Sequence, residues 1–445
     1  MALTVAIVGR PNVGKSTLFN RLAGRKIAIV HDTPGVTRDR IEAEAQLGPL
    51  GLRLVDTAGF EDAKGETLPA RMVEQTRAAI READVCLLLM DGRAGVTAGD
   101  EIIASELRKS GKPVVLAANK IEGRAAAANV NDAFSLGLGE PIALSAEHGI
   151  GLGDLLEALS PYASEELESA PGEQSQQPLK LAIVGRPNVG KSSLFNALIG
   201  EERALTSPEA GTTRDAVIAK WEVEGRAFLL HDTAGLRKKA RAAGHTLEEL
   251  SIESTLEAIR FAECVIVLID ATMPFEKQDL AIADLVAREG RAIVFAINKF
   301  DLLENRAGAI SRFREQRDEL LPQVFGAPLI ATSARTGEGI ERVLEAVLAA
   351  DQAWNTRVGT GELNRFLEQA MSAHPPPAVH GRRVRIRYIT QPKARPPTFA
   401  LFGNQLKALP DSYMRYLQNA LRKAFDLYGT PIRFSLRTSK NPYAG

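Results

Sequence analysis

The chain has 445 residues, too many for one hydrophobic core, which suggests about three domains. Lys plus Arg equals Asp plus Glu at 55 each, and 45% of the residues are hydrophobic, as in an ordinary globular protein. No apolar run reaches the roughly 18 residues of a membrane-spanning helix, and the start MALTVAIVGR is typical of a first strand rather than a signal peptide. Cys86 and Cys264 lie in apolar runs, so we expect buried, reduced thiols in a cytoplasmic protein rather than a disulfide or a metal site.

The neutral charge balance hides an uneven distribution. Residues 351–445 carry 15 Lys and Arg against 5 Asp and Glu, so the rest of the chain is net acidic. A basic tail on an acidic body indicates a polyanionic partner for the tail.

A long internal repeat organises the chain. Thr37 and Thr213, like the two GRPNVGKS segments, are separated by 176 residues, a domain-sized period. The motifs recur in the same order: GRPNVGKS at 9–16 and 185–192, TRD at 37–39 and 213–215, DTAG at 56–59 and 232–235, NK at 119–120 and 298–299, and SA at 145–146 and 333–334. Later spacings widen, which indicates changed loop lengths within one duplicated fold.

In each copy, apolar runs alternate with helical stretches. The strands expected in the first copy are 3–8, 52–56, 85–91, 113–119 and 141–145, with helices such as 67–82 and 98–110 between them. This βαβ pattern predicts an α/β fold, with a mainly parallel sheet and helices on both faces.

The domains are expected at 1–160, 179–352 and 353–445. Residues 161–178 between the copies are rich in Pro, Ser and Gln, which predicts a flexible linker. A helical extension through SEELES is the alternative. The last domain is expected to fold as αββαβ on one sheet, with helix 363–373, strands 382–391 and 398–404, helix 411–429 beginning at Asp411 or Ser412, and strand 431–439.

GRPNVGKS follows a strand and opens a helix in both copies, which is the context of a phosphate-binding P-loop. Its glycines let backbone N–H groups cradle phosphates, and the helix N-terminus adds positive potential. Lys15 and Lys191 would reach the β- and γ-phosphates, and Ser16 and Ser192 would coordinate Mg²⁺. The expected loop residues are Gly9, Arg10, Pro11, Asn12, Val13, Gly14, Lys15 and Ser16, and Gly185, Arg186, Pro187, Asn188, Val189, Gly190, Lys191 and Ser192.

DTAG fits the segment that holds Mg²⁺ and contacts the γ-phosphate, although a plain strand-end turn is the alternative. Thr37 and Thr213 would reach Mg²⁺ only when a γ-phosphate is present, so 30–40 and 205–215 are candidate switch loops. The expected metal ligands are Ser16, Thr37 and Asp56, and Ser192, Thr213 and Asp232. The nucleotide contacts expected here are Asp56, Thr57, Ala58, Gly59 and Phe60, and Asp232, Thr233, Ala234, Gly235 and Leu236.

The base is indicated by NKFD at 298–301, where Asn298 can contact the purine and Asp301 can accept from guanine N1–H and the 2-amino group. The first copy reads NKIE, so Glu122 places its carboxylate one methylene further out, and guanine affinity should persist but change. The SA motifs would offer backbone contacts to guanine O6. The expected base-binding residues are Asn119, Lys120, Ile121, Glu122, Ser145 and Ala146, and Asn298, Lys299, Phe300, Asp301, Ser333 and Ala334.

Hydrolysis is expected to be slow. Phe60 and Leu236 follow DTAG where many GTPases place a water-orienting Gln, and neither side chain can do this. The chain therefore suits a switch better than a metabolic enzyme.

These paired motifs and the basic C-terminal module resemble the Der (EngA) GTPases over nearly the whole chain. The resemblance implies two tandem P-loop GTPase domains and a small α+β KH-like domain. It also implies a role in assembly of the large ribosomal subunit, with rRNA as a partner, and a K⁺ ion placed by Asn12 and Asn188; stabilising the loop's turn is the alternative for these residues. Alongside Asn12 and Asn188, the residues expected from the motifs to act in hydrolysis are Lys15, Thr37, Gly59, Lys191, Thr213 and Gly235.

The tail lacks the Gly-x-x-Gly clamp of KH domains between 355 and 445. RNA contact is expected through Arg382, Arg383, Arg385, Arg387, Lys393 and Arg395, and a solvated face or docking on the acidic domains is the alternative. Lipidation motifs are missing, which argues against a membrane-associated GTPase, and about 90 tail residues leave little room for an RNA-modifying domain. We expect no membrane or DNA partner and no oligomer.

Overall fold

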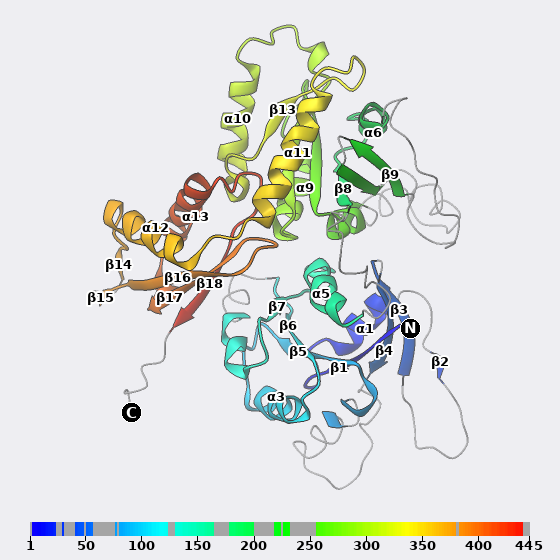
Figure 1. Cartoon of the computed structure of the whole chain (residues 1–445), viewed down its shortest axis with the longest axis vertical. Helices are drawn as coiled ribbons and strands as arrows, with labels where there is room; N and C mark the ends of the chain where they lie inside the picture. The colour runs from blue at the N-terminus through cyan, green and yellow to red at the C-terminus, as the bar shows by residue number, and fades with distance from the viewer. Residues whose placement is uncertain are drawn as a thin grey trace. The chain divides into compact units, whose positions relative to one another are not determined.

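The computed structural model describes residues 2–23, 29–30, 41–48, 50–56, 76–77, 80–122, 130–163, 178–199, 218–223, 226–231, 255–379 and 382–438. The chain divides into two compact units, Met1–Glu173 and Gln174–Gly445 (Figure 1). Among the helices of the described ranges, none is long and apolar enough to cross a bilayer.

The first unit is built on a seven-stranded sheet in the order β2-β3-β4-β1-β5-β6-β7. Its strands are β1 (Leu3–Val8), β2 (Ile29–Val30), β3 (Ile41–Leu47), β4 (Leu50–Asp56), β5 (Val85–Asp91), β6 (Val114–Asn119) and β7 (Ile142–Ala143). Its helices include α1 (Lys15–Ala23), α3 (Ala98–Ser110), α5 (Leu152–Leu159) and the 3-10 segments η2 (Asn131–Leu136) and η3 (Ser160–Tyr162). The central pairs are parallel and β2–β3 and β3–β4 are antiparallel, so the predicted, mainly parallel sheet is confirmed.

Two expectations for this unit need comment. Strand β3 was not predicted, because IEAEAQL alternates polar with mostly small residues and contains no long apolar run. The helix predicted at 67–82 lies largely outside the described residues.

The second unit repeats this sheet in the order β13-β12-β11-β8-β10-β9. Its strands are β8 (Leu179–Val184), β9 (Ile218–Val223), β10 (Arg226–His231), β11 (Cys264–Asp270), β12 (Ala292–Asn298) and β13 (Leu329–Ala331). Its helices include α6 (Lys191–Ile199), α9 (Lys277–Arg288), α10 (Ala309–Leu320) and α11 (Ile340–Asn355), with 3-10 segments η4 (Phe300–Leu302) and η5 (Pro322–Val324).

Alternate side chains of β11 enter separate hydrophobic cores on the two faces of this sheet. Val265 and Val267 pack in the core that includes residues of α9 and α10, whereas Ile266 and Leu268 pack with residues of α6 and α11. Helices therefore cover both faces, as the sequence predicts.

Both cysteines are free and buried, as predicted. Burial raises the pKa of the Cys86 thiol to about 11 and also raises that of Cys264, since an apolar surrounding disfavours the thiolate.

The C-terminal module has the predicted αββαβ order in its main sheet and two helices, but the strand expected at 382–391 is divided at Val384, and its first part pairs in a separate two-stranded sheet. Its elements are α12 (Thr360–Ala373), β14 (Ala378–Val379), β15 (Arg382–Arg383), β16 (Arg385–Lys393), β17 (Thr398–Asn404), η6 (Leu406–Ala408), α13 (Asp411–Phe425) and β18 (Arg433–Thr438). Helix α13 ends at Phe425 rather than near Gly429, because Asp426 takes a left-handed conformation (φ 51°), and its N-cap is Pro410. The main sheet has the order β16-β17-β18, and α12 and α13 lie on one side of it (Figure 1).

This module docks on the second copy within the same compact unit. The Ile293 backbone N–H at the start of β12 donates to Gly429 O at 2.7 Å. Gly290 of the second copy lies against Pro396 of the module, since a Cβ on Gly290 would be 2.7 Å from the Pro396 Cγ; within the second copy, Trp354 of α11 donates its indole N–H to Gly290 O at 2.7 Å.

Three arginines of the module join this contact. Arg422 donates to Gln323 O and Arg433 to Arg288 O, while the Arg395 guanidinium lies 5.5 Å from the Trp354 ring centre and 3.5 Å from Glu263. Arg395 was predicted to contact RNA, with docking on the acidic domains as the alternative; for this residue the structure shows docking.

Candidate nucleotide sites

Each GRPNVGKS segment links a strand to a helix: β1 to α1, and β8 to α6. In the first loop, Gly14 takes φ 98° and a Cβ there would lie 2.3 Å from Asn119 Nδ2. A Cβ on Gly9 would lie 2.3 Å from Leu89 O. Gly185 and Gly190 meet the same restrictions from Leu268 and Asn298. Glycine is therefore required at both positions by close approach, as well as by backbone conformation.

The P-loop lysines bridge their own loops. The Lys15 ammonium donates to Gly9 O at 2.9 Å and to Arg10 O at 3.0 Å. Lys191 does the same with two carbonyls of its loop, at 2.9 and 2.8 Å. In both copies a positive charge is therefore held against the loop that the sequence assigns to the phosphates.

A buried asparagine connects two loops in each copy. Asn119, 2% exposed, donates from Nδ2 to Val13 O at 2.8 Å and accepts at Oδ1 from the Ala146 N–H at 2.8 Å. Asn298 makes the same pair of bonds, at 2.7 Å to Val189 O and 2.9 Å from the Ala334 N–H. One amide thus fixes the P-loop relative to the SA loop, a bracing role that the motifs did not reveal.

The lysine after each asparagine pairs with an aspartate that ends the neighbouring strand. Lys120 contacts Asp91 at 2.8 Å and Lys299 contacts Asp270 at 2.6 Å. Burial raises the pKa of both aspartates, but their hydrogen bonds outweigh it and hold each pKa below its usual value. The sequence reasoning missed these aspartates, although both follow a long apolar run directly.

The arginine of each P-loop pairs with a buried aspartate. Arg10 contacts Asp100 at 2.9 Å and Arg186 contacts Asp279 at 2.9 Å. Asp100 also forms a capping box with Thr97 at the start of α3. Asp279 forms the equivalent capping box with Glu276 at the start of α9. The P-loop is thereby anchored to a helix on one face of the sheet.

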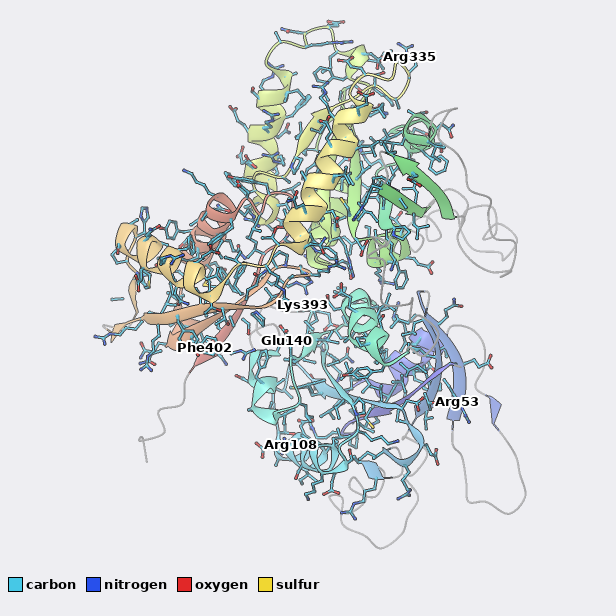
Figure 2. All side chains as sticks on the ribbon, viewed as in Figure 1. Arg53, Arg108, Glu140, Arg335, Lys393 and Phe402 are labelled. Atoms are coloured by element: carbon cyan, nitrogen blue, oxygen red, sulfur yellow. The ribbon has the colours of Figure 1, made fainter. Side chains whose placement is uncertain are left out.

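The two candidate base-reading carboxylates have different partners. Glu122 accepts from Ser145 Oγ at 2.6 Å and from Arg93 Nη2 at 2.7 Å. Asp301 accepts at 2.7 Å from Arg335, which lies in the loop between β13 and α11 (Figure 2). Burial raises the pKa of Glu122, but the hydrogen bonds from Ser145 and Arg93 outweigh burial and lower this pKa overall. The pKa of Asp301 is also lowered, first by a hydrogen bond from Ser333 and then by the charge of Arg335. Both groups are ionised at neutral pH.

Several predicted residues lie outside the described part of the chain. They are Thr37, Thr57, Ala58, Gly59 and Phe60 in the first copy, and Thr213, Asp232, Thr233, Ala234, Gly235 and Leu236 in the second. Asp56 ends β4, but its side chain is also outside the described part. Ser16 and Ser192 lie exposed in the first turns of α1 and α6.

Profiles of three protein families match the chain. A profile described as "50S ribosome-binding GTPase" matches residues 4–120 and 180–299, and one described as "KH-domain-like of EngA bacterial GTPase enzymes, C-terminal" matches 357–437. The GTP-binding domain of elongation factor Tu matches 251–352. Among solved structures, the G domain of the iron transporter FeoB from T. maritima is 27% identical and covers 39% of this chain and 99% of its own, with a TM-score of 0.28.

Full-length relatives give the strongest match. GTPase Der of Azorhizobium caulinodans is 54% identical over 100% of this chain and 99% of its own. GTPase Der of Rhodopseudomonas palustris is 52% identical over 100% of this chain and 98% of its own. The chain therefore belongs to the Der family of GTPases, with two tandem GTPase domains and a KH-like C-terminal domain.

Proposed function

We propose that this chain is a GTP-hydrolysing switch in assembly of the large ribosomal subunit, and that nucleotide state controls its binding to ribosomal particles. The observation that carries the proposal is the duplicated site, in which one buried asparagine fixes the P-loop to the SA loop in each copy. The family profile's "50S ribosome-binding" description and the basic C-terminal module support the particle as partner.

In each site the P-loop backbone and its lysine would hold the phosphates, and Glu122 or Asp301 would accept from the guanine. The loops fit a polyanion, because each opens onto the N-terminus of a nine-residue helix and holds a lysine against its carbonyls. Ser16 and Ser192 offer exposed hydroxyls to Mg²⁺, with the predicted Thr37, Asp56, Thr213 and Asp232 completing the oxygen ligands. The metal would neutralise charge on the phosphates.

Slow hydrolysis with stimulation by K⁺ is part of the proposal. Asn12 and Asn188 take φ of 64° and 63°, a left-handed conformation that Asn tolerates, so a turn-forming role has its own support. Asn→Gly at both positions keeps the left-handed turn and removes the side-chain carboxamide, so these variants separate turn formation from K⁺ binding. We expect faster hydrolysis in K⁺ than in Na⁺ at equal ionic strength, and loss of that difference in the glycine variants. Glycine variants that retain the K⁺ effect would leave the asparagines as turn formers.

Particle binding tests the switch directly. Purified large subunits should co-sediment with the chain in a non-hydrolysable GTP analogue and much less in GDP. Lys191→Ala should remove this nucleotide dependence, because the second domain carries the C-terminal module. Binding that is identical with GTP analogue, GDP and no nucleotide would reject the switch and indicate a constitutive RNA-binding protein.

A further inference from the structure

One face of the C-terminal sheet packs on α12 and α13. The opposite face, here called the open face, is buried at Thr398 and Ala400 but exposed at its Tyr388 edge. Phe399 and Leu401 of β17 lie in the core with residues of α12 and α13. Phe402, the next residue, lies on the opposite side of the sheet, away from both helices (Figure 2). In the strand register Phe402 is directly between Tyr388 of β16 and Arg437 of β18. A cross-strand row of two aromatic rings and one guanidinium therefore lies on this open face.

The three groups form a column. The rings of Tyr388 and Phe402 are stacked, with centres 4.2 Å apart and planes 9° from parallel. The Arg437 guanidinium carbon lies 5.5 Å from the Phe402 ring centre. Because β16 is the edge strand of the main sheet, Tyr388 is the outer end of the column, and it is 42% exposed.

A β-bulge places an arginine next to this tyrosine. The register shifts between Ile386 and Tyr388, so Arg387 is the extra residue, and Arg387 and Tyr388 are both exposed although they are adjacent. A Cβ on Gly403 would lie 2.0 Å from Arg385 O, so glycine allows the strands to approach here. Arg387 and Tyr388 therefore interrupt the alternation of exposed and buried residues along the strand predicted at 382–391.

The segment that carries β16 and β17 has charged residues of one sign only. Residues 382–410 contain seven Lys and Arg and no Asp or Glu. Arg385 and Arg387 are exposed beside Tyr388. A flat aromatic end flanked by cations fits a ligand with flat bases and a negative backbone, which is a single-stranded nucleic acid.

We propose that the open face of the C-terminal sheet is a stacking platform for unpaired RNA. One base extends the column on the outer face of Tyr388, and Arg385 and Arg387 contact the phosphates on either side. Stacking accepts any base, so the platform binds strand ends or loops without a sequence motif. The choice of RNA rests on the proposed function, whereas the stacking geometry does not.

A titration with a short single-stranded RNA tests the platform. The full chain is mixed with a fluorescein-labelled decamer of adenosine, without nucleotide or ribosomes. Tyr388→Leu keeps an apolar side chain but removes the flat ring, and should weaken binding about 5- to 150-fold, the value of one stacked base. Tyr388→Phe should bind within about twofold of the wild type, because it keeps the ring.

Matched controls separate stacking from charge and from folding. Tyr162 in the first unit has the same 42% exposure, and Tyr162→Leu should leave RNA affinity unchanged. Arg387→Gln should lower the slope of log affinity against log salt by about 0.7, the value for one phosphate contact, whereas Tyr388→Leu should keep the slope. Thermal unfolding midpoints show whether each variant is folded.

Equal RNA affinity in the wild type and folded Tyr388→Leu would overturn the platform and favour a protein partner for this face. A wild type that does not bind the decamer would overturn it too. Because no ribosome is present, these results are independent of nucleotide-controlled particle binding, which can fail while the platform stands.

Discussion

The two candidate nucleotide sites share the buried asparagine that joins the P-loop to the SA loop, but differ in how the candidate base-reading carboxylate is held. In the first copy Glu122 is paired with Arg93, from the loop after β5. In the second copy Asp301 is paired with Arg335, from the loop after β13. Neither arginine has a counterpart in the other copy. Thr272 of the second copy occupies the position of Arg93 and bonds Asp270, and Glu147 of the first copy occupies the position of Arg335. Divergence has thus kept a cation beside the carboxylate while moving its source.

The largest expected effect separates the two sites by their carboxylates. Asp301→Asn should weaken guanine binding at the second site by about two to four orders of magnitude, since two charge-assisted hydrogen bonds are lost, and should favour xanthine nucleotides. The first site should be unchanged. Titrations of fluorescent nucleotides in a Lys15→Ala background measure the second site alone. Unchanged guanine affinity would remove Asp301 from base recognition.

The buried asparagine that joins the P-loop to the SA loop should stabilise both copies to the same extent. Asn119→Ala leaves Val13 O and the Ala146 N–H without their buried partner, which should cost about 3 kcal/mol in the free energy of unfolding of the first domain. Asn298→Ala should do the same in the second. Denaturant unfolding and nucleotide titration of both variants check this, and a loss of affinity without any loss of stability would indicate a contact to the purine rather than a brace.

Exchanging the arginines sharpens the comparison. Arg93→Ala should weaken guanine binding at the first site by about two- to fivefold, a modest effect because the arginine is exposed. Adding Glu147→Arg should restore it by supplying the cation from the second copy's position. Arg335→Ala is the matched control, with an effect on the second site alone. A double variant no better than Arg93→Ala would mean that the two positions are not interchangeable.

The smallest effect concerns pH. The pKa of Glu122 and that of Asp301 are both held below the ordinary values of these carboxyls. A carboxylate with a lowered pKa stays ionised above that value, so guanine affinity at both sites should be flat from about pH 8 to 5 and fall only in stronger acid. Titrations across this range check it; a decline centred near pH 6 would contradict the ionised state.

Much of this architecture follows from sequence, because long apolar runs and loop motifs are local patterns. The strand before each P-loop and the αββαβ order of the tail are of this kind. Strand β3 was missed because its identity depends on hydrogen bonds with β4, and the bulge at Arg387 because it depends on Gly403 in another strand. The arginine partners of the carboxylates come from loops 29 and 34 residues away, so no spacing rule reveals them.

The central claim is that each chain holds two separate guanine nucleotides. Equilibrium dialysis with a radiolabelled, non-hydrolysable GTP analogue measures this directly, with the matching ATP analogue as competitor. We predict two nucleotides bound per wild-type chain, one in Lys15→Ala and one in Lys191→Ala, with no displacement by the ATP analogue in any of them. A wild type that binds one nucleotide, and keeps it in Lys15→Ala, would contradict the claim and leave the first copy without a nucleotide site.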